Sequence, residues 1–333
     1  MLRKFIILNL TLLLIFSQIS RGEIKTSGLI QTWFSSTESV AGDINNGFTV
    51  RRARLKIMGQ ENESLNWACQ YAWDKQVLRL IDAYLEFNLG SNQRVRIGQF
   101  PIPGTKEGGL TSSKNLDFIE RAGIVRYWGQ STALNSFRSA GVQLHGKLFT
   151  PNLYYATMVA NYDGKQLFSP SLSNVNNFDN GLISSSRIQY NILEPLEGGV
   201  FFLVGENDSL AKRSYGMHLY YDQNPIIVKT EFIAGLDEQD MKYNGLSVSC
   251  GFNIGDFEPM YRFGIYTPEK TNSENVKRFI NHCLGLNYCI NKQTNIQVNY
   301  LIRNEQMQKG FDPVMNNLFY IHLNYFFDKT IAI

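Results

Sequence analysis

Long apolar stretches are missing from almost the whole sequence. After residue 19 there is no run of about 18 apolar residues, the length that a membrane-spanning helix requires, and the mean hydropathy is −0.21. Proline is scarce as well, with 9 of 333 residues. A helical membrane protein is therefore excluded beyond the N-terminus, whereas long strands without proline breaks are favoured.

Motifs that carry chemistry are also few. The chain has four histidines and four cysteines, and the adjacent pair His282 and Cys283 lacks a second pair at the spacing of a zinc site. A G-x-S-x-G nucleophile motif is absent from the sequence. We therefore expect no metal, no cofactor and no enzymatic role. A net charge of only +3 gives no indication of a nucleic-acid partner.

The cysteines are too far apart for disulfides in the arrangement that we expect. Cys69 and Cys250 would lie on the outer face of distant strands. Cys283 and Cys289 would share one strand at a separation of roughly 20 Å, whereas the Cα atoms of a disulfide lie within about 7 Å. We predict four free thiols.

The N-terminus has the features of a leader. Arg3 and Lys4 precede an apolar run that ends at Ile19, and the small residues Ser20 and Gly22 follow. This pattern predicts a secretory signal peptide over residues 1–22, followed by one domain over residues 23–333. A membrane anchor is the alternative, but the run is short for a bilayer span.

The rest of the sequence alternates between apolar and polar residues with a period of two. In the stretch 49–58, Ala53, Leu55 and Ile57 point one way, and Arg52, Arg54 and Lys56 point the other. The stretches 80–87, 139–148 and 296–303 alternate in the same manner, with Ile81 on the apolar face. Such strands of roughly ten residues are typical of membrane β-barrels. Arg51 falls on the apolar register, where it would reach the membrane interface or a subunit contact.

Short and long connections alternate along about sixteen such strands. The short ones carry Gly, Pro, Asn and Asp, which tight turns use, and the longest connection covers residues 99–137. We predict a transmembrane antiparallel β-barrel of about sixteen strands with this third long loop folded into the lumen. A soluble β-sandwich is the alternative, but it would not need a charged inner face on nearly every strand.

The polar face of the strands carries more bases than acids. Three acids are expected there, Asp82, Glu86 and Glu231. The bases expected there are Arg52, Arg54, Lys56, Arg94, Arg96, Lys147, Arg187, Lys229, Arg262 and Arg303. Rows of Arg and Lys favour anions in a pore. The alternative is that these bases brace the wall by pairing with acids.

The long connection should contain a short helix over residues 113–121. Ser112 or Ser113 would cap it, Asp117 would lie in an early turn and Arg121 near its end. In such a loop the serines, Lys114 and Arg121 would meet a solute.

The sequence resembles the phosphate-selective porin O and P family. The resemblance rests on FTVRRARLK at 48–56, IDAY at 81–84, VRIGQF at 95–100, and TSSK at 111–114 followed by Glu120 and Arg121. It covers about the first 150 residues after the leader, and the rest only through architecture. It implies a sixteen-stranded barrel, usually trimeric, with the third loop inside.

The resemblance also implies roles for individual residues. By motif, Arg51, Arg52 and Arg54 would belong to a basic ladder at the constriction. Ser112, Ser113 and Arg121 would lie in the loop that contacts the anion, with Asp82 as the acid beside the site. The best-known members carry a lysine two residues before the TSS motif, where this chain has Gly109, and the nearest upstream lysine is Lys106.

Together these features predict a passive diffusion channel of the bacterial outer membrane. We expect a homotrimer in the lipid bilayer that prefers small anions, with phosphate as one candidate. Two alternatives stay open, a weakly selective general porin and a structural or adhesive barrel with a plugged lumen. Outer-membrane barrels commonly end on Phe, whereas here six residues follow Phe327, so the last strand either extends further or carries an unusual assembly signal.

Overall fold

The computed structural model describes most of the chain. It covers residues 23–38, 44–74, 77–132, 137–162, 181–207, 211–237, 241–269, 278–306, 314–315 and 317–332. The expected signal peptide lies outside the described residues. No helix within these ranges is long and apolar enough to cross a membrane.

Strands make up nearly all of the described chain. The first half contains β1 (Glu23–Glu38), β2 (Ile44–Asn62), β3 (Leu65–Asp74), β4 (Val77–Gly90), β5 (Gln93–Pro101), β6 (Arg138–Lys147), β7 (Leu153–Asn161) and β8 (Gly181–Leu193). The second half contains β9 (Leu196–Asn207), β10 (Ala211–Gln223), β11 (Ile226–Leu236), β12 (Lys242–Phe252), β13 (Phe257–Glu269), β14 (Arg278–Asn291), β15 (Thr294–Gln306), β16 (Val314–Met315) and β17 (Leu318–Ala332).

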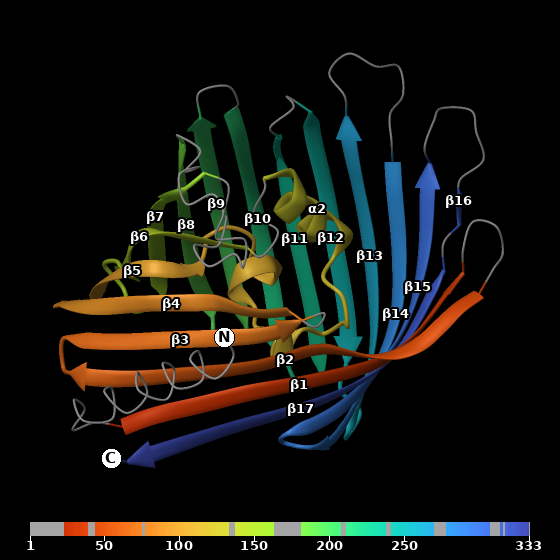
Figure 1. The fold of residues 1–333 in the computed structure, drawn as a ribbon. Coiled ribbons are helices and arrows are strands. Elements are labelled where there is room, and N and C mark those ends of the chain that lie inside the picture. The colour runs from red at the N-terminus through yellow and green to blue at the C-terminus, as the bar shows by residue number, and fades with distance from the viewer. Residues whose placement is uncertain are drawn as a thin grey trace, which may run out of the picture.

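These strands form one closed antiparallel barrel (Figure 1). Each long strand pairs with its neighbour in the chain, and β17 closes the ring by pairing with β1 from Glu23↔Ala332 to Thr37↔Leu318. Apart from the two-residue β16, the barrel has sixteen strands, as the alternation predicts. Closure leaves no free sheet edge, which is what a sheet surrounded by lipid requires. A β-sandwich is thereby excluded.

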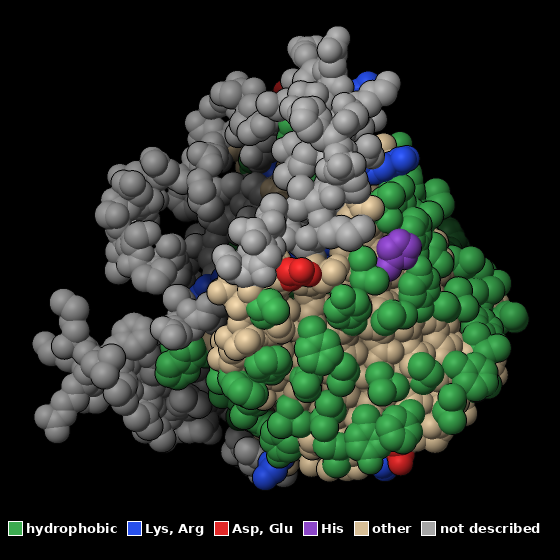
Figure 2. Space-filling view, turned by 90° about the vertical axis from the view of Figure 1, so that its right-hand side faces the viewer, with side chains coloured by type: hydrophobic (Ala, Val, Ile, Leu, Met, Phe, Trp, Pro, Cys, Tyr) green, Lys and Arg blue, Asp and Glu red, His purple; other side chains and the backbone are tan. Residues whose placement is uncertain are grey.

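The two faces of the wall differ in polarity. In β10, Tyr215, Met217 and Leu219 are about half exposed and point outward, whereas Ser214 and His218 are buried and point inward. Figure 2 shows one outer side of the barrel, on which hydrophobic side chains dominate and charged ones are few. The inner face therefore holds the polar side chains, as predicted.

Connection lengths differ between the two ends of the barrel. One end has short turns, such as residues 63–64 between β2 and β3, 91–92 between β4 and β5, and 194–195 between β8 and β9. At the other end, 36 residues separate Pro101 of β5 from Arg138 of β6. Strand β17 continues past Phe327 to Ala332, so the last strand extends further, one of the two expected outcomes.

The β5–β6 segment (residues 102–132) lies against the inner face of the wall (Figure 1). It contains the π-helical turn η1 (Lys106–Leu110), the 3-10 turn η2 (Ser113–Asn115) and the helix α2 (Gly123–Ser131). Trp128 of α2 packs edge-on against Phe201 of β9 at 5.7 Å between ring centroids, and its indole nitrogen donates to Ser214 Oγ at 2.9 Å. Burial of a ring of this size stabilises the segment's position by a few kcal/mol.

Two β-bulges turn consecutive residues toward the interior. In the β1–β2 pair, Gln31 faces Arg52 and Thr32 faces Val50, so Arg51 is the extra residue. In the β3–β4 pair, the extra residue is Ile81, which is only 3% exposed. A bulge adds one residue to one strand and shifts its faces. The expected outward positions of Arg51 and Ile81 are therefore wrong.

Gln99 compensates for the second bulge. Its amide donates to the backbone carbonyls of Leu80 and Ile81, both at 3.0 Å, and the side chain is 5% exposed. An unpaired carbonyl in a membrane wall costs several kcal/mol, so this amide lets β4 carry the bulge without leaving both groups unsatisfied.

Candidate functional site

Arg51 and Arg52 enter the interior side by side because of the bulge in β2. Arg51 forms an ion pair with Glu120 of the β5–β6 segment at 3.4 Å and lies over the Trp33 ring at 5.1 Å from its centroid. Arg52 is 5% exposed, and its guanidinium donates to Gln31 Oε1 at 3.0 Å. That partner is uncharged, so Arg52 keeps its charge without a directly bonded acid.

Arg54 joins the wall to the β5–β6 segment. One nitrogen of its guanidinium donates to Ser113 Oγ at 3.1 Å, and the other pairs with Asp74 at 3.1 Å. Gln31 supports the same contact by donating to the Ser113 carbonyl at 3.2 Å. Arg54 of the expected basic ladder is therefore in direct contact with Ser113 of the expected anion-contacting loop.

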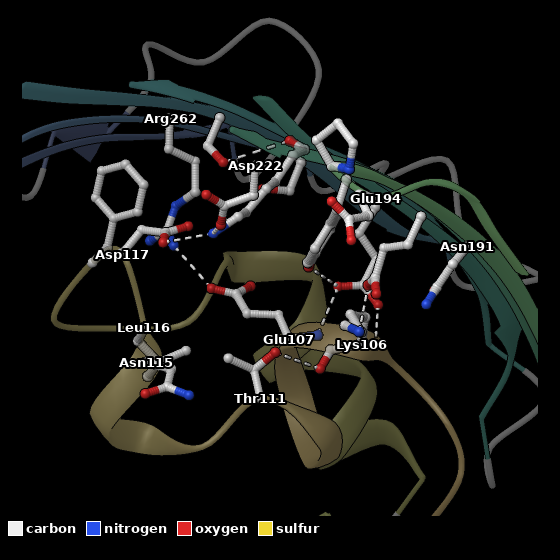
Figure 3. A pocket seen from close by; sticks show the side chains of 18 residues that line it. Lys106, Glu107, Thr111, Asn115, Leu116, Asp117, Asn191, Glu194, Asp222 and Arg262 are labelled. Atoms are coloured by element: carbon white, nitrogen blue, oxygen red, sulfur yellow. Dashed lines mark hydrogen bonds and ion pairs between the residues drawn. The ribbon is translucent and has the colours of Figure 1, made fainter. Parts of the chain in front are cut away.

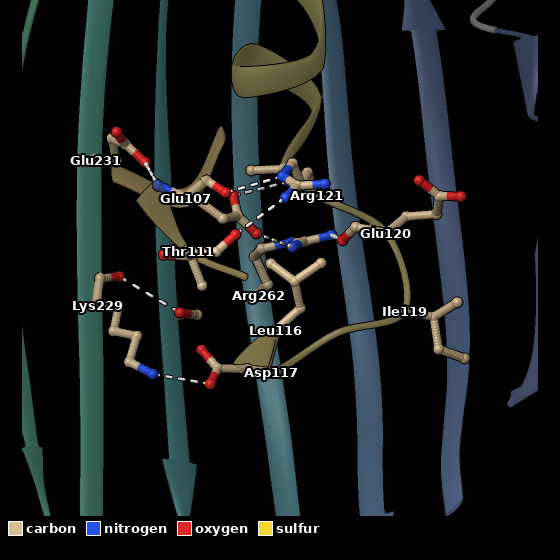
Figure 4. A network of polar contacts seen from close by, with 12 residues as sticks. Glu107, Thr111, Leu116, Asp117, Ile119, Glu120, Arg121, Lys229, Glu231 and Arg262 are labelled. Atoms are coloured by element: carbon tan, nitrogen blue, oxygen red, sulfur yellow. Dashed lines mark hydrogen bonds and ion pairs between the residues drawn. The ribbon is translucent and has the colours of Figure 1, made fainter. Parts of the chain in front are cut away.

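Arg121 comes from the segment itself (Figure 4). It donates to the backbone carbonyls of Glu107 at 2.8 Å and Thr111 at 3.1 Å. Burial is the main cause that lowers the pKa of Arg121 to about 10, and the nearby charges of Arg54 and Arg138 act in the same direction. The guanidinium is still charged at neutral pH, and its bonded partners carry no full charge.

We define the basic cluster as Arg51, Arg52, Arg54, Arg121 and Arg138. Electrostatic coupling links Arg52 to Arg51, Arg54 and Arg121, and links Arg138 to Arg54 and Arg121. Three acids form ion pairs with it, namely Glu120 with Arg51, Asp74 with Arg54, and Asp82, which pairs with Arg138 at 2.5 Å, whereas Glu107 near Arg121 pairs with Arg262. Five bases against three acids leave a surplus of two positive charges.

A cavity of about 90 Å³ lies beside the basic cluster. Its charged lining comprises Arg121, Arg126, Arg262, Arg303 and Glu120. Burial would raise the pKa of Glu120, but Arg51 and Arg126 outweigh that effect and the net shift is downward. Glu120 therefore stays ionised and offsets only part of the charge of these arginines.

Other expected site residues lie elsewhere on the inner wall. Glu86 binds Arg96, and it also pairs with Arg94 at 3.4 Å and with His145 at 3.2 Å. Lys56 is half-buried and has no ion pair within the described residues, but the nearby charge of Asp82 stabilises its ammonium group. Arg94 and Arg96 thus form a second, acid-compensated group on β5, apart from the basic cluster.

The expected helix over residues 113–121 is wrong. Ser112 does cap a turn, because its hydroxyl accepts from the Lys114 backbone at 3.5 Å, but that 3-10 turn ends at Asn115. The chain then runs without a helix until α2 begins at Gly123. Lys114 is 43% exposed and pairs with Asp328 of β17 at 3.7 Å, so it does not join the basic cluster.

The chain between η2 and α2 is extended because side chains of the wall bind its backbone groups. Gln297 donates to the Leu116 carbonyl at 3.0 Å, and the Ile119 N–H donates to Asn299 Oδ1 at 2.8 Å. Amide side chains of β15 thus satisfy groups that a helix would have used internally. Leu116 and Ile119 are buried, as expected for residues that pack the segment on the wall.

Several residues of the candidate site escaped sequence reasoning. Glu107 and Glu120 pair with Arg262 and Arg51, and Arg138 of β6 pairs with Asp82 of β4. Glu107 and Glu120 lie in a connection without a periodic pattern, so the sequence does not indicate which way their side chains point. Only the adjacency of Glu120 and Arg121 in the motif could have indicated that this acid belongs to the site.

Histidines and cysteines occupy the faces that were predicted. His145 pairs with Glu86 inside and His218 and His322 are buried, whereas His282 lies on the outer wall and bonds to Tyr261 Oη at 2.7 Å. The four cysteines are free. Within the described residues no group of three or more His, Cys, Asp or Glu is arranged to hold a metal ion.

A closed barrel of sixteen strands, apolar outside and polar inside, defines the class of bacterial outer-membrane porins. Residues 24–187, nearly half of the chain, match the model of the family described as phosphate-selective porin O and P. The resemblance noted in the sequence is thereby confirmed for this part of the barrel. No curated protein matches the sequence significantly.

Solved structures of outer-membrane proteins share the fold. The trimer form of OmpT from Vibrio cholerae superposes with a TM-score of 0.68 at 11% identity, covering 92% of this chain and 99% of that one. The anion-selective porin from Comamonas acidovorans gives 0.65 at 13% identity, covering 91% and 99%. The channel DcaP of Acinetobacter baumannii gives 0.66 at 12% identity, covering 92% and 98%. Family and fold are those of a channel rather than an enzyme.

Proposed function

We propose that this porin passes small solutes by passive diffusion and prefers anions. The observation that carries the proposal is the surplus positive charge of the basic cluster, which sits where the β5–β6 segment meets β2. Apolar walls focus the field of such charges into the open part of the lumen. Anions would therefore be concentrated at this level of the pore, and cations would be depleted.

Passage through this site needs no chemical step. An anion would exchange part of its hydration shell for guanidinium N–H donors of Arg52, Arg54 and Arg121, with the Ser113 hydroxyl as a further donor. Because Arg54 and Arg121 are held by the contacts described above, their guanidinium groups are already oriented before a solute arrives. Binding by several donors without burial of the whole anion allows rapid release, which conduction requires.

Phosphate is one anion that we propose for this pore. Guanidinium forks match pairs of phosphate oxygens, and the matched family is described as phosphate-selective. The lysine that the best-known members carry is replaced by Gly109, and Lys106 pairs with Glu197 of β9. A general, weakly selective pore is the second candidate, since Asp74, Asp82 and Glu120 neutralise three of the five bases in the basic cluster.

We also propose a homotrimer anchored in the lipid bilayer. The structural similarity to a porin described in a trimer form supports the assembly. The outward band of half-exposed apolar residues supports contact with lipid, because each such group is stabilised away from water. The expected signal peptide at residues 1–22 would direct export to this location.

Reversal potential across a KCl gradient in a planar bilayer tests the proposal. We expect the wild-type chain to favour chloride over potassium. Neutralising Arg52 by Arg52→Gln should lower the chloride preference by about fivefold, because one charge near the path contributes on the order of 1 kcal/mol. Arg213→Gln serves as the matched control, since Arg213 is exposed on the outer face of β10.

Two results would contradict the proposal. Potassium selectivity of the wild type, or no conductance in a barrel that has folded, would exclude an anion-preferring pore. Equal effects of Arg52→Gln and Arg213→Gln would show that selectivity does not arise from the basic cluster. Selectivity near unity in the wild type would favour the general pore.

A further inference from the structure

A second cavity lies between the β5–β6 segment and the wall from β8 to β13. Its volume is about 330 Å³, Figure 3 shows residues that line it, and none of the five arginines of the basic cluster belongs to its described lining. Glu194 and Pro195 of the short β8–β9 turn line it, as does Asp222 near the end of β10. It therefore opens at the end of the barrel where the short turns lie, and we call it the acidic cavity.

The charge of the acidic cavity is opposite to that of the basic cluster. Three bases line it, Lys106, Lys229 and Arg262. The acids that line it are Glu107, Asp117, Glu194, Glu197, Asp222 and Glu231. Acids thus outnumber bases by six to three around one small space.

The bases are already engaged by acids of the same lining. Lys106 binds Glu197, Arg262 pairs with Glu107 at 3.2 Å, and Lys229 lies 2.8 Å from Asp117 and 3.1 Å from Asp222 (Figure 3). None of them is left to balance a further acid. The acids of this lining therefore outnumber the bases that could balance them.

Two acids of the lining lack an ion pair within the described residues. Glu231 accepts instead from the backbone N–H groups of Lys106 at 2.5 Å and Glu107 at 3.2 Å, which fixes the start of η1 (Figure 4). Glu194 is exposed in the turn and has no such partner. A cationic group that enters the cavity would thus find an acid free to receive it.

Ser247 adds a neutral polar group to this lining. It belongs to the inward face of β12, lines the cavity and is only 6% exposed, and none of the hydrogen bonds among the described residues uses its hydroxyl. The Ser247 hydroxyl can therefore donate a hydrogen bond to, or accept one from, a bound molecule or a water.

A third cavity of opposite charge adjoins the acidic one. It has a volume of about 310 Å³, and Arg96 and Arg187 line it, whereas no acid occurs among its described lining residues. Gln189 belongs to this lining and donates to Glu197 of the acidic cavity at 2.8 Å. We call it the arginine cavity, and one side chain of Gln189 connects the two.

We propose that these paired cavities favour small anions that carry one ammonium group, as anionic amino acids do. The inference rests on the proposed anion-preferring pore. It specifies a class of solute for the end of the pore at which the short turns lie. A carboxylate of the solute would face Arg187, which bonds to the Gly104 carbonyl and to His218 rather than to an acid, while its ammonium would face Glu194 and Asp222. A simple anion could use only the arginine cavity and would be repelled by its neighbour.

Bi-ionic reversal potentials with two matched monoanions test this inference. The full chain is placed in planar bilayers with the potassium salts of L-glutamate and of the monoamide of glutaric acid, which has the same net charge and a similar length but no ammonium group. We expect glutamate to be about two- to fivefold more permeant, the range for one partly exposed charge pair. Because the two solutes have the same net charge, the general preference of the pore for anions affects both equally and cancels in their permeability ratio.

The double variant Glu194→Gln/Asp222→Asn should bring this permeability ratio to about one. Both side chains are exposed, so the barrel should still fold. Glu63→Gln is the matched control, because Glu63 is an exposed acid in the short β2–β3 turn at the same end, and it should leave the ratio unchanged.

The outcomes separate this inference from the proposed function. A wild-type ratio of one, or a ratio that survives in the double variant, would overturn the inference. Chloride-over-potassium selectivity measured in the same membranes reports on the proposed function alone. An anion-selective pore that does not distinguish the two monoanions would therefore refute only the paired-cavity inference.

Discussion

Individual arginines of the inner wall differ in what neutralises them. Arg96 and Arg94 share Glu86, and Arg262 has Glu107, whereas Arg52 and Arg121 bind only uncharged oxygen atoms. A paired base contributes little field along the pore, because its acid lies within a few ångströms. The number of arginines is therefore a poor guide to selectivity, and their partners decide it.

Arg121→Ala should weaken a phosphate block of the chloride current more than Arg303→Ala. Arg121 is coupled to Arg54 and Arg138, so it acts together with the basic cluster, whereas Arg303 lies on β15 at the edge of the 90 Å³ cavity. Loss of one charge-assisted hydrogen bond corresponds to about 1.5 to 3 kcal/mol, or tenfold and more in the blocking concentration. For Arg303→Ala we expect about twofold.

Titration of inorganic phosphate at low chloride measures both blocking concentrations. The same block in both variants would show that the β5–β6 segment does not hold the anion. Ser113→Ala gives a second reading with less risk to folding, because it removes a hydroxyl that Arg54 contacts at 3.1 Å and leaves the arginines in place.

At the scale of elements, period-two alternation was enough to predict the strands but not their bulges. A bulge is set by one extra residue, and neither Arg51 nor Ile81 differs in type from what a regular strand would tolerate. The β5–β6 segment was predicted less well, since its extended part is held by Gln297 and Asn299 from β15, far away in sequence. Contacts with residues that are distant in the sequence leave no periodic pattern in the sequence of the segment itself.

Gly98 is the residue on which the β4–β5 pairing depends, and Gly98→Ala should destabilise the barrel. Its φ of +131° is unfavourable for a side chain, and a Cβ atom would lie 2.2 Å from the Ala83 carbonyl oxygen. We expect a loss of about 1 kcal/mol or more in the free energy of unfolding, measured by urea titration of the refolded barrel with heat-modifiable gel migration as the readout.

Gly198→Ala is the control for this change. A Cβ atom at Gly198 would first meet Leu219 at 3.5 Å, an ordinary contact, and its φ is not in the left-handed region. An equal loss at both positions would mean that glycine removal as such, rather than the backbone of Gly98, causes the effect.

Across the whole molecule, the interior carries regions of opposite charge rather than one sign throughout. The basic cluster lies where β2 meets the β5–β6 segment, and the acidic and arginine cavities lie together toward the short turns. The net charge of +3 conceals this arrangement, because it sums regions of opposite sign. A solute in the interior would therefore meet both basic and acidic surfaces.

The outer face determines whether the barrel can reside in a membrane at all. Leu219 is 50% exposed in the middle of β10, and Leu219→Arg would place a charge in the hydrocarbon layer at a cost of about 2 to 4 kcal/mol. Ile226→Arg introduces the same charge on an outward residue next to the short β10–β11 turn, where the cost falls to about 0 to 1 kcal/mol. Urea titration of both variants refolded into lipid vesicles measures the difference. If the two substitutions cost the same, the apolar band does not face lipid, and the proposed location in a bilayer would have to be abandoned.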